Sequence, residues 1–272
     1  MKNIVVVMTH YDRRLLLKRT LLSLASQRLS SQVKIIVVDD GSAHPLIQQD
    51  VDVVPLLDVQ LVTLHQADKK WYSPDIALNI GFQHALNKGA EIVIVQNAEC
   101  IHVGEVLEYA VQSVMDDNYV TFGCLSLDEV SCKDILNLDF YSLATSCRVG
   151  ANQDGQLAWY NHPLYRPVAY EFCAAITTKN ILKLNGYDER FAFGWGYSDN
   201  YWLARVRKLG LKVEITAPPQ PFVVHQWHPS SGFRYPAEAI EHNSLLYNQL
   251  YGQLLKGKID IRAQHIITED LK

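Results

Sequence analysis

The sequence predicts an α/β fold built on a Rossmann-like, doubly wound and mostly parallel sheet with helices on both faces. Two observations predict it. Short continuous apolar runs rich in β-branched residues alternate with segments whose leucines recur at helical spacing, which is the pattern of βαβ units. Polar residues follow several of the apolar runs, as expected where the carboxyl ends of parallel strands form a ligand-binding edge.

The first hundred residues carry the clearest alternation of strand and helix patterns. The expected elements are, in order, a strand over residues 3–8, a helix over 13–27, strands over 33–38 and 60–65, a helix over 74–88 and a strand over 91–96. Pro74 suits the first turn of its helix, and Gly89 suits the position just past the end. Such connections join strands in parallel, so a doubly wound sheet follows.

The regular pattern breaks down over residues 126–167, where polar, aromatic and turn-forming residues mix, with a turn signal at 152–155. This region predicts a hairpin or an excursion, not a new domain. The later expected elements are a strand over 172–177, helices over 179–184 and 198–209, strands over 212–216 and 222–225, and an amphipathic helix over 237–255. Ser198 is expected to cap the helix that Gly210 ends. No interdomain linker is evident, so one domain is expected over 1–272.

Composition narrows the class of protein. A chain of 272 residues that is 48% hydrophobic can bury a substantial core. A net charge of −4 provides no basic field for a phosphate backbone, which argues against a nucleic-acid partner. The apolar run before Thr9 is too short for a signal peptide, and no stretch approaches the roughly 20 apolar residues of a transmembrane segment. Five cysteines without CxxC spacing argue against disulfides and structural zinc, so we expect a cytoplasmic protein.

Three polar segments follow the first, second and fourth predicted strands. They are Thr9-His10-Tyr11, Asp39-Asp40-Gly41-Ser42 and Gln96-Asn97-Ala98-Glu99. No GxGxxG follows the first strand, which argues against a dinucleotide site. Taken alone, an Asp-Asp-Gly-Ser segment is an ordinary turn, because Asp and Gly are favoured there.

Together, the first two segments resemble the nucleotide-binding half of the family 2 glycosyltransferases, which have a GT-A fold. The resemblance implies that Thr9 and Tyr11 flank the base of a nucleotide and that Asp39 bonds the imide nitrogen of the base. Asp40 is implied as a further nucleotide contact.

The helix pattern that begins at Asp75 is similar to the helix that precedes the metal strand in the same family. That similarity implies that Asn79 approaches the nucleotide, while simple helix packing remains an equal alternative. Lys69 and Lys70 precede the helix and lie either near the diphosphate or on a solvated edge.

Asn97 and Glu99 stand where this family usually carries Asp-x-Asp. A hard divalent cation prefers oxygen ligands, which these side chains would supply at the strand end. By bridging the two phosphates, such a cation neutralises the charge that develops on the leaving group. Glu99 offers a carboxylate and Asn97 only a neutral carbonyl. His225 and His228 resemble the late histidine that completes the metal site in many GT-A enzymes, with His225 preferred. Imidazole favours Mn²⁺ over Mg²⁺. The alternatives are a solvent-facing Glu99 and structural histidines.

The segment from Gly186 to Tyr201 resembles the acceptor end of GT-A enzymes, including the galactosyltransferase type. The resemblance implies that Asp199 is the catalytic base, which takes the proton of the acceptor hydroxyl opposite the leaving diphosphate. The implied acceptor contacts are Trp195, Gly196, Ser198 and Asn200. Ser198 and Asn200 replace acidic residues often found in the family. The alternative is that Asp199 merely complements a helix dipole.

These observations predict a metal-dependent, inverting glycosyltransferase that moves a hexose or N-acetylhexosamine from a nucleoside-diphosphate sugar to a glycan or lipid-linked glycan in polysaccharide or glycoconjugate biosynthesis. A UDP-sugar is the favoured donor, with dTDP- and GDP-sugars open. Residues 1–100 would bind nucleotide, 101–235 would hold metal and acceptor, and 236–272 would form a helical extension.

Two other classes of protein remain as alternatives. A GT-A-fold module that binds a sugar nucleotide or glycan without turnover is favoured by Asn97. A sugar-nucleotide pyrophosphorylase needs a glycine-rich basic loop after the first strand, which residues 9–12 do not provide. Lys256 and Lys258 after the last helix leave open a peripheral contact with a membrane, and the favoured alternative is that this helix packs on the body of the protein.

Overall fold

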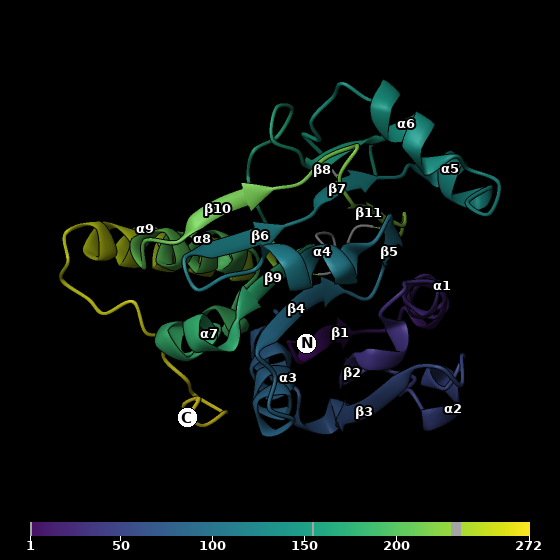
Figure 1. Cartoon of the computed structure of the whole chain (residues 1–272). Coiled ribbons are helices and arrows are strands. Elements are labelled where there is room, and N and C mark those ends of the chain that lie inside the picture. Colours follow the sequence, from purple (N-terminus) through teal and green to yellow (C-terminus); the bar gives the residue numbers. More distant parts are fainter. Residues whose placement is uncertain (1, 154, 230–234) are drawn as a thin grey trace.

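The computed structural model describes residues 2–153, 155–229 and 235–272 and contains two sheets (Figure 1). The strands of the larger sheet are β1 (Ile4–His10), β2 (Lys34–Asp40), β3 (Asp58–Leu64), β4 (Ile92–Asn97), β6 (Asn118–Thr121), β9 (Cys173–Thr177) and β10 (Lys212–Ile215). Their spatial order is β10-β6-β9-β4-β1-β2-β3. The strands of the smaller sheet, in spatial order, are β5 (Cys100–Val103), β11 (Phe222–His225), β7 (Gly123–Ser126) and β8 (Ala158–Asn161).

Helices cover both faces of the larger sheet. The helices of the described residues are α1 (Arg14–Ala25), α2 (Gln48–Val51), α3 (Asp75–Asn87), α4 (Val106–Ser113), α5 (Glu129–Lys133), α6 (Phe140–Ser146), α7 (Thr178–Leu184), α8 (Ser198–Lys208) and α9 (Ala237–Leu255). Helices α5 and α6 pack against the smaller sheet, and α9 packs on α8. Short 3₁₀ turns occur at Ser30–Gln32, Gln66–Asp68 and Glu189–Phe193. Helices α5 and α6 lie at one end of the molecule and α9 near the opposite end (Figure 1).

The sheet is mostly parallel, as predicted. Strands β2 and β4 flank β1 in parallel, and β3 and β10 pair in parallel with β2 and β6. Strand β9 is the exception, because it runs antiparallel between β4 and β6. The carboxyl ends of β1, β2 and β4 therefore meet at one edge, and Thr9 pairs directly with Asn97 there.

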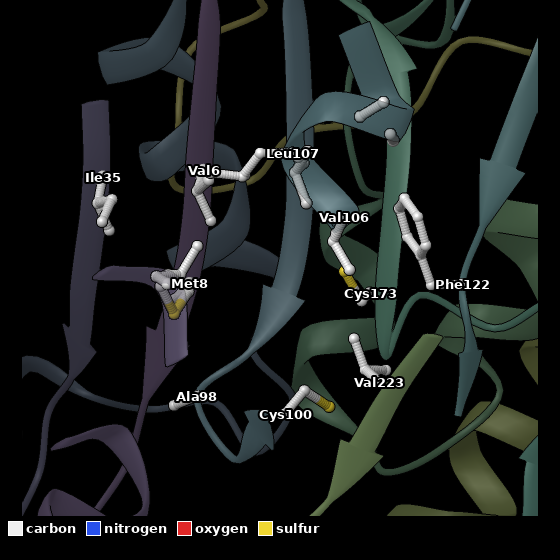
Figure 2. Close-up of a cluster of buried hydrophobic side chains, with 14 of the residues drawn as sticks. Val6, Met8, Ile35, Ala98, Cys100, Val106, Leu107, Phe122, Cys173 and Val223 are labelled. Atoms are coloured by element: carbon white, nitrogen blue, oxygen red, sulfur yellow. The ribbon is translucent and has the colours of Figure 1, made fainter. Parts of the chain in front are cut away.

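The core lies on both faces of the larger sheet because alternate strand residues point to opposite sides. Val6 and Met8 pack with α1 and α4 on one face, and Figure 2 shows both side chains on the same strand within this cluster. Val5 and Val7 pack with α3, α7 and α8 on the other face. Helix α3 approaches β1 closely, since a Cβ on Gly81 would lie 2.4 Å from Val7 Cγ1.

The region after residue 126 is an excursion, as predicted, that carries α5, α6 and β8. Strand β8 returns antiparallel to β7 and adds an edge strand to the smaller sheet. Of the predicted turn at 152–155, residue 154 lies outside the described residues. The strands of the smaller sheet are each four residues long, and the sequence predicted β11 among them but not β5, β7 or β8.

One predicted helix cap is wrong. Tyr197, in the left-handed conformation with φ 63°, precedes α8, and no side chain caps this helix. Ser198 is the first helical residue, and its hydroxyl bonds to Asp75 instead.

All five cysteines are free thiols. Within the described part of the chain, no helix is both long and apolar enough to traverse a bilayer.

Candidate functional site

A cavity of about 450 Å³ opens at the carboxyl ends of β1, β2 and β4. Its lining includes most of the predicted site residues: Thr9, Tyr11, Asp40, Asn97, Glu99, Trp195, Gly196, Ser198, Asp199, His225 and His228. Asp39, Asn79 and Asn200 do not line it. The fold thus brings motif residues from the first hundred positions and motif residues after position 190 to one cavity.

At the end predicted to bind nucleotide, the cavity contains a buried ion pair next to aromatic rings. Lys69 Nζ lies 2.5 Å from Asp40 Oδ2, and Trp71 Nε1 donates to Asp40 Oδ1 at 2.8 Å. Burial raises the pKa of Asp40 and lowers that of Lys69, although each partner opposes the shift of the other. Lys69 Nζ is also 5.2 Å from the ring centroid of Tyr11. Asp40 therefore holds Lys69 beside the ring expected to contact the base.

Asp39 faces away from the cavity and organises the loop after β2. Its carboxylate accepts hydrogen bonds from Ser42 N at 3.1 Å, Ser42 Oγ at 2.5 Å and Leu46 N at 2.7 Å. Burial alone would raise the pKa of Asp39, but the hydrogen bonds from His10, Ser42 and Leu46 outweigh it and lower the pKa. The glycine that follows, Gly41, has a φ of +73°, which permits the tight turn.

The structure places Asn79 away from the cavity, which corrects the expectation that it approaches the nucleotide. Its Nδ2 donates to Tyr187 O at 2.9 Å and to Glu189 Oε1 at 3.0 Å, and its Oδ1 accepts from Tyr187 N at 2.8 Å. Asn79 is fully buried. Asn79 links α3 to the start of the segment 186–201. This contact corresponds to the alternative of simple helix packing.

Glu99, His225 and His228 form a cluster whose ligand atoms all lie within 4.8 Å of one another. Strand pairing creates the cluster, because β11 pairs with β5 so that His225 aligns with Cys100, the residue after Glu99. Burial lowers the pKa of His225 despite the nearby Glu99, which favours the neutral imidazole that a metal requires. One carboxylate and two imidazoles fit Mn²⁺ better than Mg²⁺.

Arg13, which the sequence did not single out, contacts this cluster. Its Nη1 lies 2.5 Å from Glu99 Oε1. Burial alone would raise the pKa of Glu99, but Arg13 and the hydrogen bonds from His225 and His228 hold that pKa well below its ordinary value. Glu99 is therefore charged at neutral pH, as a metal ligand must be.

Asp199 lies in the first turn of α8 and is exposed to the cavity. A second carboxyl, that of Glu171, also lines the cavity but is only 8% exposed. The pKa of Glu171 is raised well above its ordinary value, first by burial and then by the charge of Asp199. The pKa of Asp199 is also raised, because the cavity walls exclude much of the bulk water around it. Glu171 precedes a strand in an irregular stretch, so no sequence signal marked it.

The predicted acceptor contacts are only partly brought together. Trp195 stacks on Tyr235 with ring centroids 4.1 Å apart, and both line the cavity. Ser198 is buried against Asp75, whose pKa burial raises to about 7. Asn200 does not line the cavity, and its amide donates to Tyr170 Oη at 2.8 Å.

Comparisons with known families match two consecutive parts of the chain. A family model described as glycosyl transferase family 2 matches residues 5–153, and one described as the N-terminal domain of galactosyltransferase matches residues 170–228. No curated protein sequence matches the chain significantly.

Several solved structures resemble the chain. The mannosyltransferase PcManGT from Pyrobaculum calidifontis, in complex with GDP-Man and Mn²⁺, is 16% identical, with a TM-score of 0.57 over 95% of this chain and 70% of that chain. S. aureus TarS 1–349 in complex with UDP-GlcNAc is 12% identical, with a TM-score of 0.62 over 95% and 71%. A longer TarS structure is 13% identical with a TM-score of 0.59, and 43% of its length is covered. At these identities the similarity shows the fold alone, which is the GT-A fold expected from the sequence.

Proposed function

This chain belongs to glycosyl transferase family 2, and from that premise we propose that it is a metal-dependent inverting glycosyltransferase that uses a nucleoside-diphosphate sugar. One observation carries the proposal. A single cavity joins the residues expected to bind the base, a carboxylate–imidazole cluster and the carboxylate of Asp199. They would supply the three functions that sugar transfer from a nucleotide requires: binding of the nucleotide, binding of a metal and acceptance of a proton.

The metal would be held by Glu99, His225 and His228, and Asn97 lines the same cavity. A divalent cation bound there would neutralise the charge that develops on the leaving diphosphate. Thr9 and Tyr11 would flank the base, and Asp40 with Lys69 would complete this end of the site. Asp39 would act on this end of the site through the loop that it organises.

Asp199 would take the proton from the acceptor hydroxyl. The proximity of Glu171 supports this assignment, because two neighbouring carboxyls do not readily both ionise. Glu171, which is buried, would keep its proton, and Asp199, which is exposed to the cavity, would be charged and able to act as the base. Inversion then needs only a correctly placed acceptor, because the transition state is oxocarbenium-like.

UDP is the favoured nucleotide, and the transferred group is a hexose or an N-acetylhexosamine. Related folds support this range of donors, since TarS was solved with UDP-GlcNAc and PcManGT with GDP-Man. The acceptor would be a glycan or a lipid-linked glycan, one ring of which would pack near Trp195. We propose further that residues 1–272 act as one domain in the cytoplasm, with any contact at a membrane being peripheral.

The test is donor hydrolysis and transfer from a panel of UDP-, dTDP- and GDP-sugars, with Mn²⁺ or with EDTA, for the wild type and Asp199→Asn. Turnover of one donor only with metal, together with loss of transfer but not of nucleotide binding in Asp199→Asn, would support the mechanism and identify the donor. Nucleotide binding without turnover under all conditions, with acceptor glycans supplied, would favour the alternative of a binding module, for which Asn97 is the supporting feature.

A further inference from the structure

A single oxygen atom of Glu99, Oε1, is shared by three basic side chains. Arg13 Nη1 lies 2.5 Å from it, His225 Nε2 3.3 Å and His228 Nε2 3.5 Å. The two imidazoles and the carboxylate are the donor set assigned above to a divalent cation. Arg13 is therefore bound to the carboxylate that a cation would need, through the oxygen that both imidazoles approach.

The environments of the two partners differ. The side chain of Glu99 is 4% exposed, so its charge needs a compensating cation, because an unpaired buried carboxylate is costly. The side chain of Arg13 is 28% exposed and lines the cavity, so its guanidinium can leave Glu99 without being buried elsewhere.

The backbone of Arg13 is fixed independently of this ion pair. Its N–H donates to His10 Nε2 at 3.0 Å, and its carbonyl accepts from Leu17 N at 3.0 Å at the start of α1. Release of the guanidinium therefore requires rotation of the side chain alone, with no movement of α1.

We propose that Arg13 is an exchangeable counter-ion: it competes with the divalent cation for Glu99, and once displaced it pairs with the diphosphate of the donor. The inference rests on the proposed function, since it needs both a metal and a nucleoside diphosphate in this cavity. A guanidinium beside a bound dication is repelled by it, whereas a diphosphate attracts the guanidinium and matches its two-pronged geometry.

In this arrangement the side chain of Arg13 has opposite effects on the affinities for the divalent cation and for the nucleoside diphosphate. In the protein without nucleotide, Arg13 opposes metal binding by occupying Glu99 and by its charge. In the ternary complex Arg13 favours nucleotide binding. A residue that merely supports the fold of the site would affect both ligands in the same direction.

The experiment measures two equilibria for the wild type, Arg13→Met and Arg14→Met. Mn²⁺ binding without nucleotide is followed by the electron paramagnetic resonance signal of free Mn²⁺, and UDP binding at saturating Mn²⁺ by calorimetry. Methionine retains the apolar stem of arginine. Arg14 is the matched control, because it is the next residue in the chain, is 51% exposed and pairs with Asp50 instead of Glu99.

For Arg13→Met we expect Mn²⁺ to bind about tenfold tighter and UDP about tenfold weaker, as the removal of one competing and one attracting charge implies. Arg14→Met should match the wild type in both. Mn²⁺ affinity that is unchanged or weaker in Arg13→Met overturns the proposal, as does unchanged UDP affinity. If neither the wild type nor Arg13→Met binds Mn²⁺, this inference fails, while UDP binding and donor turnover still decide the proposed function separately.

Discussion

The hydroxyl of Ser198, at the start of α8, donates a hydrogen bond to Asp75 Oδ1, at the start of α3, although the two residues are 123 positions apart. The contact joins the first turns of two helices that both border the cavity. Asp75 is 1% exposed, and burial is the main reason that its pKa is raised to about 7. A carboxyl in this state makes the stability of the fold depend on pH.

Asp75→Asn should remove that dependence. The pKa of Asp75 is higher in the folded than in the unfolded protein, so the folded state holds more protons between about pH 4 and pH 7. Stability is therefore lost as pH rises through this window, by at most about 1.4 kcal/mol per pH unit, and it levels off above pH 7. In urea unfolding at pH 4, 6 and 8, the free energy of unfolding of the variant should increase relative to that of the wild type as pH rises. Parallel curves for the two proteins would contradict a raised pKa at Asp75.

Amide substitutions at Glu171 and Asp199 should have different effects on turnover. Asp199→Asn removes the base, and we expect kcat to fall by at least about 100-fold with UDP affinity unchanged. Glu171→Gln replaces a protonated carboxyl with a neutral amide of the same shape, so kcat at neutral pH should stay within about fivefold of the wild type. Steady-state kinetics with the identified donor provide the measurement. An equal loss in both variants would mean that Glu171 acts as a charged group.

The carboxylate–imidazole cluster should bind Mn²⁺ through His225. His225→Ala should weaken Mn²⁺ binding by at least about tenfold, because one ligand of a small donor set is removed. His44→Ala is the control, since the side chain of His44 is 90% exposed and does not line the cavity. Titration of Mn²⁺ into each variant measures the effect. The same affinity in His225→Ala and His44→Ala would exclude the cluster as the metal site.

Asn79→Ala should reduce stability without reducing nucleotide affinity. The substitution leaves Tyr187 N and O without their buried partner, which should cost about 2–4 kcal/mol in the free energy of unfolding. Asn137→Ala, at an exposed position, should change stability by less than about 0.5 kcal/mol. Urea unfolding measures the stabilities, and calorimetry measures UDP binding well below the unfolding midpoint. Loss of UDP affinity in folded Asn79→Ala would restore the sequence-based expectation of a nucleotide contact.

Much of the fold could be predicted because long elements leave strong patterns. The apolar runs that became β1, β2 and β4 are buried on both faces, so they stand out as continuous apolar segments. In the smaller sheet only β11 was predicted, because β5, β7 and β8 are too short to show a period and the pairing of all four strands depends on contacts between distant parts of the chain. Helix α8 was located, but its cap was not, since the bond from Ser198 to Asp75 is a tertiary contact.

The site was predicted as far as strand ends could locate it. Adjacent residues of a strand point to opposite sides, so sequence alone could not decide that Asp40 faces the cavity and Asp39 the loop. Arg13, the partner of Glu99, and Glu171, the neighbour of Asp199, could not be predicted from the sequence for another reason. Arg13 lies 86 residues before Glu99, and Glu171 lies in an irregular stretch, so only the folded chain brings them together.

Strand β9 has a mechanical consequence for how substrates enter and products leave. It comes from the half of the chain after residue 100, yet it is hydrogen-bonded along β4 of the first half. The Asn79 bonds to Tyr187 add a second tie between the same halves. A jaw-like opening of one half against the other would break this ladder, so the halves form a rigid frame. Movements that admit the donor and release the product therefore have to leave the pairing of β4 with β9 intact.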